Sequence, residues 1–174
     1  EGPTEALAIP EYLKALGYDC YENAVAVIPV DGKGNLARFW RLFTAYGIPV
    51  YLIFDNDAED DKKGIKRSEL LQTLGITDAA PIIKEADMKI EDKFTVFGKD
   101  FETTLRKLFE SEGYENLEKA AREFIGIEPD NKSDCKPLVA RYVAEKLSAC
   151  VNSKVDGWSS LLTMKLKIAE TMKC

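Results

Sequence analysis

The sequence predicts an α/β fold in which a parallel sheet is flanked by helices and followed by a C-terminal helical extension. Residues 25–30 and 49–54 are short, continuous apolar runs, which are typical of strands covered on both faces. A helical pattern follows each run, and this alternation predicts parallel strands joined by right-handed crossovers. From residue 100 onward the apolar spacing is helical throughout.

The expected elements are separated by glycines and charged loops. A first helix is predicted over residues 4–16, because Pro3 suits an opening helical turn and Gly17 ends the pattern. A Gly-rich turn at residues 31–35 leads from the first apolar run into a helix that ends at Gly47. The later elements are a helix over 65–74, a strand over 94–97 and helices over 100–112, 115–125, 134–150 and 158–172.

Two parts are predicted within a chain whose 174 residues suit about one domain of ~100–200 residues. Residues 1–112 are expected to form the α/β core, and residues 113–174 a helical extension packed on or beside it. An α/β unit that opens on a helix normally has a strand before it, and none precedes residue 4 here. We therefore expect either an excised piece of a longer protein or a first strand on a segment outside this sequence.

Composition excludes several classes of protein. The absence of histidine rules out Ser-His-Asp and Cys-His catalysis and His-ligated zinc. The longest uncharged stretch has thirteen residues, 42–54, whereas ~20 are needed to span a bilayer; no membrane association is expected. No nucleotide-binding Gly-rich motif is present. Four dispersed cysteines without a CxxC pair indicate reduced thiols in a cytoplasmic protein, although their spacing leaves a disulfide open.

The acidic excess lies entirely in the first part of the chain. Residues 1–98 carry a net charge of −6, whereas acids and bases balance in residues 99–174. This sign disfavours nucleic-acid binding unless divalent cations occupy the acids or a partner supplies a basic surface.

Paired carboxylates follow the predicted strand 49–54. Asp55 and Asp57 are two residues apart, so in extended chain their side chains point the same way. Ligands of α/β sheets gather beyond the carboxyl ends of strands, and hard divalent cations prefer oxygen ligands. The pair therefore indicates a metal site, although this short motif identifies the chemistry only loosely.

Two further acidic pairs stand at other strand-to-helix junctions. Glu1 and Glu5 flank the start of the first helix, and Asp100 and Glu102 follow the strand 94–97. Three such pairs favour a shared metal site. The simpler interpretation stays open, because acids favour the first turn of a helix and Asp100 suits a helix cap.

Two lysines are candidates for contacting phosphate. Lys136 opens a helix at the end where a cation is disfavoured by the helix dipole, so it could instead neutralise charge in a phosphoryl transition state. Lys33 lies between two glycines whose exposed backbone amides could also bind phosphate. A solvated lysine and a tight turn are the respective alternatives.

Three blocks of sequence resemble the Toprim domain of OLD-family (overcoming lysogenization defect) nucleases. They are EGPTE at residues 1–5, IPVDGKGNL at 28–36 and IPVYLIFDND at 48–57, and the resemblance covers roughly residues 1–150. The Glu-x-x-x-Glu opening, the Gly-Lys turn and Lys136 before a proline are the features that indicate the OLD branch. The resemblance implies a Toprim-like, Rossmannoid parallel sheet.

The resemblance implies a metal-dependent DNA endonuclease that uses two Mg²⁺ or Mn²⁺ ions. By position, the metal ligands would be Glu1, Glu5, Asp55, Asp57, Asp100 and Glu102. Glu1, Asp55 and Lys136 would be catalytic, with Glu1 also a base toward water, and Lys33 and Lys136 would contact the DNA phosphate. The chain departs from the family at Asp31, where glycine is common, and at Asp100, where a hydroxyl occurs.

The implied partners are DNA and the N-terminal ABC-type ATPase domain of a larger protein, which this sequence does not contain. A homodimer is left open, because Phe39, Trp40, Phe43 and Trp158 suit an interface as well as a core. The alternative functions are a non-catalytic Toprim module that binds nucleic acid, a magnesium-binding receiver-like signalling domain, and primase or topoisomerase chemistry. A topoisomerase needs a tyrosine nucleophile, and none of the seven tyrosines stands in a distinctive setting.

Overall fold

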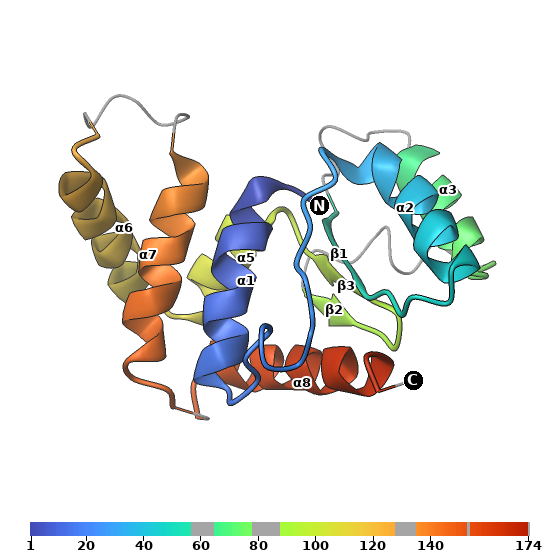
Figure 1. Ribbon diagram of the computed structural model, residues 1–174. Helices are drawn as coiled ribbons and strands as arrows, with labels where there is room; N and C mark the ends of the chain where they lie inside the picture. The colour runs from blue at the N-terminus through green and yellow to red at the C-terminus, as the bar shows by residue number, and fades with distance from the viewer. Residues whose placement is uncertain (57–64, 78–87, 128–134, 153, 174) are drawn as a thin grey trace.

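The computed structural model describes residues 1–56, 65–77, 88–127, 135–152 and 154–173. Within these residues the chain is a mixed α/β fold with a small sheet and seven helices (Figure 1). The elements are α1 Pro3–Ala15, α2 Lys33–Ala45, β1 Leu52–Asp55, α3 Ile65–Thr73, β2 Lys89–Ile90, β3 Phe94–Phe97, α5 Phe101–Leu108, α6 Ser111–Ile125, α7 Lys136–Ser148 and α8 Asp156–Thr171.

The described sheet has the strand order β1-β3-β2 and is only partly parallel. β1 and β3 pair in parallel from Leu52 opposite Phe94 to Asp55 opposite Phe97. β2 pairs antiparallel with β3, because the three residues between them suffice for a hairpin but not for a crossover helix. The expectation of an all-parallel sheet is therefore corrected at this edge.

Residues 25–30 do not form a strand of the described sheet, contrary to the sequence prediction. At their carboxyl end the amide of Val30 donates to the carbonyl of Glu1 at 3.1 Å. A strand assignment needs a ladder of such bonds with a neighbour, and in the described chain only Glu1 lies beside this segment in that way. The sequence thus indicates the apolar character of residues 25–30 correctly, but not their pairing.

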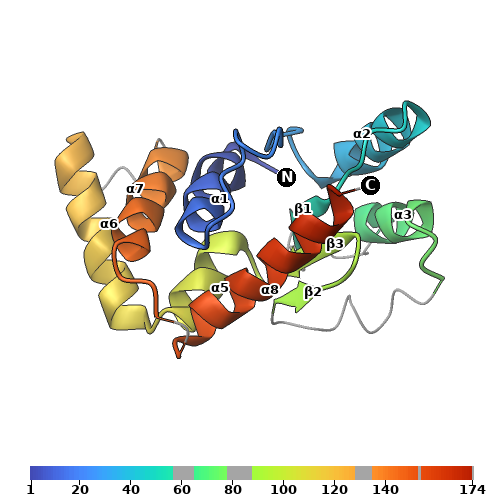
Figure 2. The same cartoon turned by 60° about the horizontal axis from the view of Figure 1, so that its bottom comes forward.

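Two apolar clusters cover opposite faces of the sheet. Leu52, Phe54, Phe94 and Val96 alternate along β1 and β3 and pack against α2 and α3. Tyr51 and Ile53 point to the other cluster, as the two-residue period of a strand requires. That larger cluster gathers buried side chains of α1, α5, α6, α7 and α8, which lie together on the other side in both views (Figures 1 and 2).

The helical pattern predicted after residue 100 is confirmed by α5, α6, α7 and α8. α7 packs along α1, while α8 passes beneath α1 and β2 (Figure 1). The division into residues 1–112 and 113–174 stays a prediction. None of the helices in the described residues combines the length and apolar character needed to cross a membrane. Cys20, Cys135 and Cys150 are free thiols.

Candidate functional site

Glu1 joins two strand-to-helix junctions at the carboxyl end of β1. Its backbone nitrogen donates to the carbonyl of Ile53 at 2.8 Å. Its Oε1 accepts from the amide of Lys33 at 2.9 Å, and its Oε2 accepts from the amide of Asp55 at 3.0 Å. One carboxylate thus ties the start of α2 to the end of β1.

Glu5 lies in the first turn of α1 and is 5% exposed. Its Oε2 accepts from the amide of Gly2 at 3.1 Å, the bond by which a glutamate at the third helical position caps the residue before the helix. A Cβ at Gly2 would stand 3.3 Å from this oxygen, so glycine lets the carboxylate approach the backbone closely. The first turn of α1 therefore fixes the orientation of Glu5.

Asp55 is the last residue of β1, and the residue after it is held in a buried position. The guanidinium of Arg67 on α3 donates to both the carbonyl and the side-chain oxygen of Asn56. Arg67 and Asn56 are both buried. α3 therefore fixes the path of the backbone directly after Asp55. Asp57, the other half of the predicted pair, lies outside the described residues.

Asp100 and Glu102 flank the start of α5. Asp100 Oδ1 accepts from the amide of Thr103 at 2.6 Å and caps the helix, which is the structural role that the sequence left open. Burial raises the pKa of Glu102; Asp100 and Glu5 raise it further, while a backbone hydrogen bond and the Lys136 ammonium lower it. A carboxyl whose charge is disfavoured by burial is one that a cation would stabilise.

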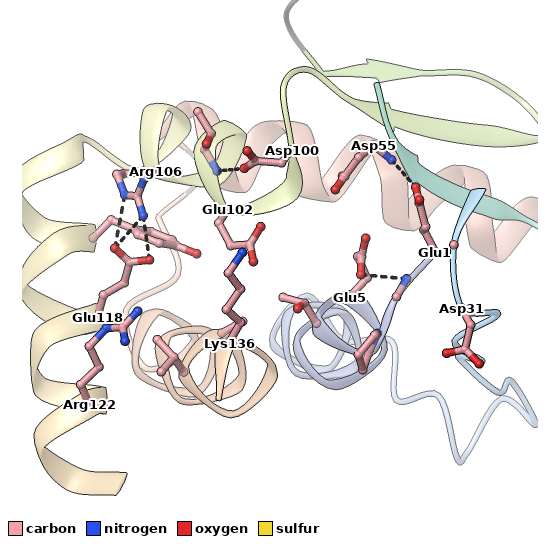
Figure 3. Close-up of a pocket in the computed structure, with 18 residues that line it drawn as sticks. Glu1, Glu5, Asp31, Asp55, Asp100, Glu102, Arg106, Glu118, Arg122 and Lys136 are labelled. Atoms are coloured by element: carbon pink, nitrogen blue, oxygen red, sulfur yellow. Dashed lines mark hydrogen bonds and ion pairs between the residues drawn. The ribbon is translucent and has the colours of Figure 1, made fainter. Parts of the chain in front are cut away.

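The acidic side chains lie around one cavity of about 680 Å³ (Figure 3). Glu1, Glu5 and Asp55 gather on one side, and Glu102 faces them with Lys136 beside it. The predicted site residues that line this cavity are Glu1, Glu5, Asp55, Asp100, Glu102 and Lys136. Asp31 at the turn before α2 also lines it. Acids separated by about one hundred residues are thus brought together.

Lys33 is placed differently from the other candidates. It is 4% exposed and is not among the described residues that line the cavity. Its backbone amide contacts the site by donating to Glu1. Its predicted contact with phosphate stays a prediction.

The far end of the cavity carries two arginines, Arg106 and Arg122, which are not among the site residues predicted from the sequence. Arg106 on α5 makes a two-pronged ion pair with Glu118 on α6, with nitrogen–oxygen distances of 2.9 and 3.2 Å. Arg122, one helical turn after Glu118, also lines the cavity (Figure 3). Arg106 stands four residues after Glu102 on the same helix face, and that spacing could have indicated it. Nothing in the sequence around Arg122 indicates that it belongs to the site, because only the packing of α6 brings it to the cavity.

The donor set suits a hard divalent cation, although no metal site is formed by the described residues. Every candidate ligand is a carboxylate oxygen, the ligand type that Mg²⁺ and Mn²⁺ prefer. Among the residues that the structure describes, no three acids or cysteines stand close enough together to hold an ion. The carboxylates surround a common space and would have to approach one another around a cation. Their chemistry therefore fits such a metal.

The first residues of the chain match a known family model. Residues 1–57 match the TOPRIM domain of overcoming lysogenization defect protein-like (OLD-like) proteins. This match confirms the resemblance to the OLD-like Toprim domain. The matched part contains Glu1, Glu5 and Asp55, which lie on one side of the cavity.

Solved structures extend the similarity in fold to the whole chain. Two structures of the C-terminal region of the OLD protein of Xanthomonas campestris pv. campestris, phased with mercury and with platinum, resemble it with TM-scores of 0.63 and 0.64. Each alignment covers 99% of this chain, and 93% and 91% of the other, at 16% identity. Among curated proteins, none matches this chain. An OLD-like Toprim domain points to a nucleic-acid-related, metal-binding module.

Proposed function

We propose that this protein is a metal-dependent DNA endonuclease that hydrolyses phosphodiester bonds by a two-metal mechanism. The observation that carries the proposal is the cavity that Glu1, Glu5, Asp55, Asp100, Glu102 and Lys136 line together. The OLD-like Toprim match of residues 1–57 supports it independently. A surface with this excess of carboxylates repels a phosphate backbone unless cations neutralise it.

The carboxylates of Glu1, Glu5, Asp55, Asp100 and Glu102, which line the cavity, would hold Mg²⁺ or Mn²⁺, and Asp57 is proposed as a further ligand. When bound, such ions lower the pKa of an attacking water and stabilise the leaving oxygen. Glu1 keeps acceptor capacity for this role, because each of its oxygens takes one amide bond and can accept a second hydrogen bond or ligand. It can therefore both orient the site and accept a proton from water.

Lys136 supplies positive charge beside the acids. Its side chain points to Glu102 (Figure 3), and its charge lowers the pKa of that carboxyl. A scissile phosphate bound between the acids and α7 would meet the same ammonium as its own negative charge grows. Lys136 would thus favour ionised Glu102 before the reaction and the charged phosphorus centre during it.

The deciding experiment is a plasmid-nicking assay with Mg²⁺, with Mn²⁺ and with EDTA side by side. We expect nicking with either ion and none with EDTA. Asp55→Asn should reduce nicking at least ~100-fold, because it removes a ligand charge. The matched control is Asp156→Asn, an exposed acid at the start of α8 outside the cavity. Nicking by Asp55→Asn at the rate of the unmodified protein would refute the assignment.

The same assay separates the non-catalytic alternative. A Toprim module that only binds nucleic acid would retard plasmid DNA in a gel in the presence of Mg²⁺ without cutting it. The proposed partners of the catalytic part are DNA and an ABC-type ATPase domain of a larger protein. Homodimerisation is proposed as well.

A further inference from the structure

The cavity changes in charge from one end to the other (Figure 3). Glu1, Glu5 and Asp55 lie at its acidic end, and Arg106 and Arg122 form its basic end. A cation is therefore favoured at one end of this space and an anion at the other. A DNA strand carries a phosphate on every nucleotide, so one strand can present different phosphates to the two ends.

The guanidinium of Arg106 keeps hydrogen-bond donors beyond its ion pair with Glu118. Its Nε donates to one oxygen of that carboxylate at 3.2 Å, and its Nη2 donates to both oxygens at 2.9 Å. An arginine has five N–H donors, and in the described residues those of Nη1 take no acceptor. Because the side chain is 33% exposed, an anion in the cavity can accept from them.

Arg122 adds a second guanidinium at the same end. It follows Glu118 by four residues on α6, so both side chains lie on one face of that helix, about 6 Å apart along its axis. Figure 3 shows Glu118 between the two arginines. The three side chains together carry one more positive than negative charge. Guanidinium groups match the geometry of phosphate oxygens, which makes phosphate the anion that this end suits.

Building on the proposed function, we propose that Arg106 and Arg122 bind a phosphate of the DNA strand other than the one that is cleaved. The spacing on α5 supports this, because Arg106 follows Glu102 by four residues, or about 6 Å along the helix. Phosphates of one strand of duplex DNA follow one another at about 3.4 Å along its axis. With the cleaved phosphate at the acids, a phosphate about one or two nucleotides away reaches the arginines. Both arginines are thus positioning residues.

Glu118 competes with this phosphate for Arg106. Its side chain is 18% exposed, less than that of Arg106, so it holds the guanidinium at the cavity wall and neutralises part of its charge. Glu118→Gln keeps an oxygen that can accept a hydrogen bond and removes the competing charge. We expect this variant to bind DNA about 3-fold more tightly. Loss of a purely structural ion pair would not strengthen binding.

The first test measures binding of a short fluorescein-labelled DNA duplex to the whole chain by fluorescence anisotropy. Ca²⁺ is present, because it takes the same oxygen ligands, and the NaCl concentration is varied. Arg122→Gln should weaken binding about 10-fold and lower the slope of log Kd against log salt concentration by about 1. Arg122→Lys keeps the charge and should keep the slope.

The matched control is Arg141→Gln on α7. Arg141 also makes an ion pair with a glutamate, Glu145, at 3.0 Å, but it is not among the described residues that line the cavity. This substitution should change neither the affinity nor the salt slope. Equal affinity and slope in Arg122→Gln and Arg141→Gln would overturn the inference. Weaker DNA binding by folded Glu118→Gln would overturn it too, since Glu118 would then support the site rather than compete with the phosphate.

Kinetics distinguish this phosphate from the cleaved one. In the plasmid assay with Mg²⁺, Arg122→Gln should raise KM about 10-fold and keep kcat within about 2-fold, because a contact made equally in the ground and transition states changes KM alone. A fall in kcat with unchanged KM would contradict the inference. If the unmodified protein did not nick DNA, the nuclease proposal would fail, and the binding measurements would still decide whether the arginines contact a phosphate.

Discussion

At the scale of single residues, the charge state of Glu102 depends on opposing influences. Burial is the largest influence and raises the pKa of its carboxyl. A backbone hydrogen bond and Lys136 lower this pKa, and the nearby charges of Asp100 and Glu5 raise it. A carboxyl whose folded pKa lies above its unfolded value favours the protonated state on folding. Its stabilising contribution is complete below the ordinary pKa of about 4.3 and is lost as the pH rises through the raised value.

Replacing Glu102 with Gln should remove this dependence on pH. We compare the Tm of the variant with that of the unmodified protein in EDTA. As the pH rises from about 4 to 7, this difference should change in favour of the variant by roughly 2 °C. Thermal unfolding followed by circular dichroism at both pH values measures the difference. Glu123→Gln, an exposed position on α6, is the control and should show no such trend. A Glu102→Gln difference that is the same at both pH values would contradict the argument.

Asp100 has a structural role in the helix cap, and two substitutions separate it from any role in the reaction. Asp100→Ala removes the acceptor of the Thr103 amide and should cost about 1 kcal/mol. Asp100→Asn keeps a capping oxygen but removes the charge. We expect Asn to keep the Tm within about 1 °C and to lower nicking about 10-fold, as loss of a supporting ligand does. Normal nicking by the Asn variant would leave Asp100 as a cap alone.

At the scale of elements, the sequence predicted what is locally encoded. The strand at residues 94–97 is confirmed as Phe94–Phe97, and the helices agree within a few residues at their ends, because apolar periodicity and terminal glycines are local properties. Pairing is not local. β2 could not be predicted, because its two residues contain no apolar run. The strand predicted over residues 25–30 has no partner in the described sheet.

The contact between α5 and α8 depends on a glycine. A Cβ at Gly157 would stand 2.6 Å from the ring of Phe109, and this ring packs edge-on against Trp158 at a centroid distance of 5.4 Å. Gly157→Ala should therefore destabilise the protein by about 1–3 kcal/mol, as overpacking of a core does. The expected loss in Tm is roughly 3–10 °C.

The matched control for this substitution is Gly113→Ala. Gly113 is also helical, within α6, and has nothing within 4 Å of an added Cβ. Alanine there should stabilise the helix by about 0.5–1 kcal/mol. If both substitutions raised Tm, backbone propensity would outweigh the Phe109 contact, and the argument from overpacking would be wrong.

At the scale of the whole molecule, the sequence predicted the acidic chemistry of the site but not the extent of the cavity. Acid pairs at strand ends can be recognised in the sequence, because the ends of strands and helices can themselves be recognised there. The basic end of the cavity depends on how α6 packs against α5 through Arg106 and Glu118, a contact between helices that sequence spacing does not specify. For Lys33 the sequence did not indicate that the backbone amide donates to Glu1.

The net charge of −6 and the cavity of carboxylates predict that divalent cations stabilise the folded protein. A ligand that binds only the native state adds about 2.7 kcal/mol at one hundred times its Kd. For a chain of this size, saturating Mg²⁺ or Mn²⁺ should then raise Tm by roughly 5–10 °C. Thermal unfolding over a concentration series measures the shift, and EDTA should reverse it.

General screening of charge would also raise Tm, so the effect must be separated from ionic strength. NaCl at matched ionic strength acts on all surface charges, whereas a bound ion needs particular ligands. Asp55→Asn should therefore lose most of the shift caused by Mg²⁺ while keeping that caused by NaCl, and Asp156→Asn should keep both. An equal response to Mg²⁺ in the two variants would mean that the ion acts on the overall charge and that the carboxylates around the cavity do not form a specific site.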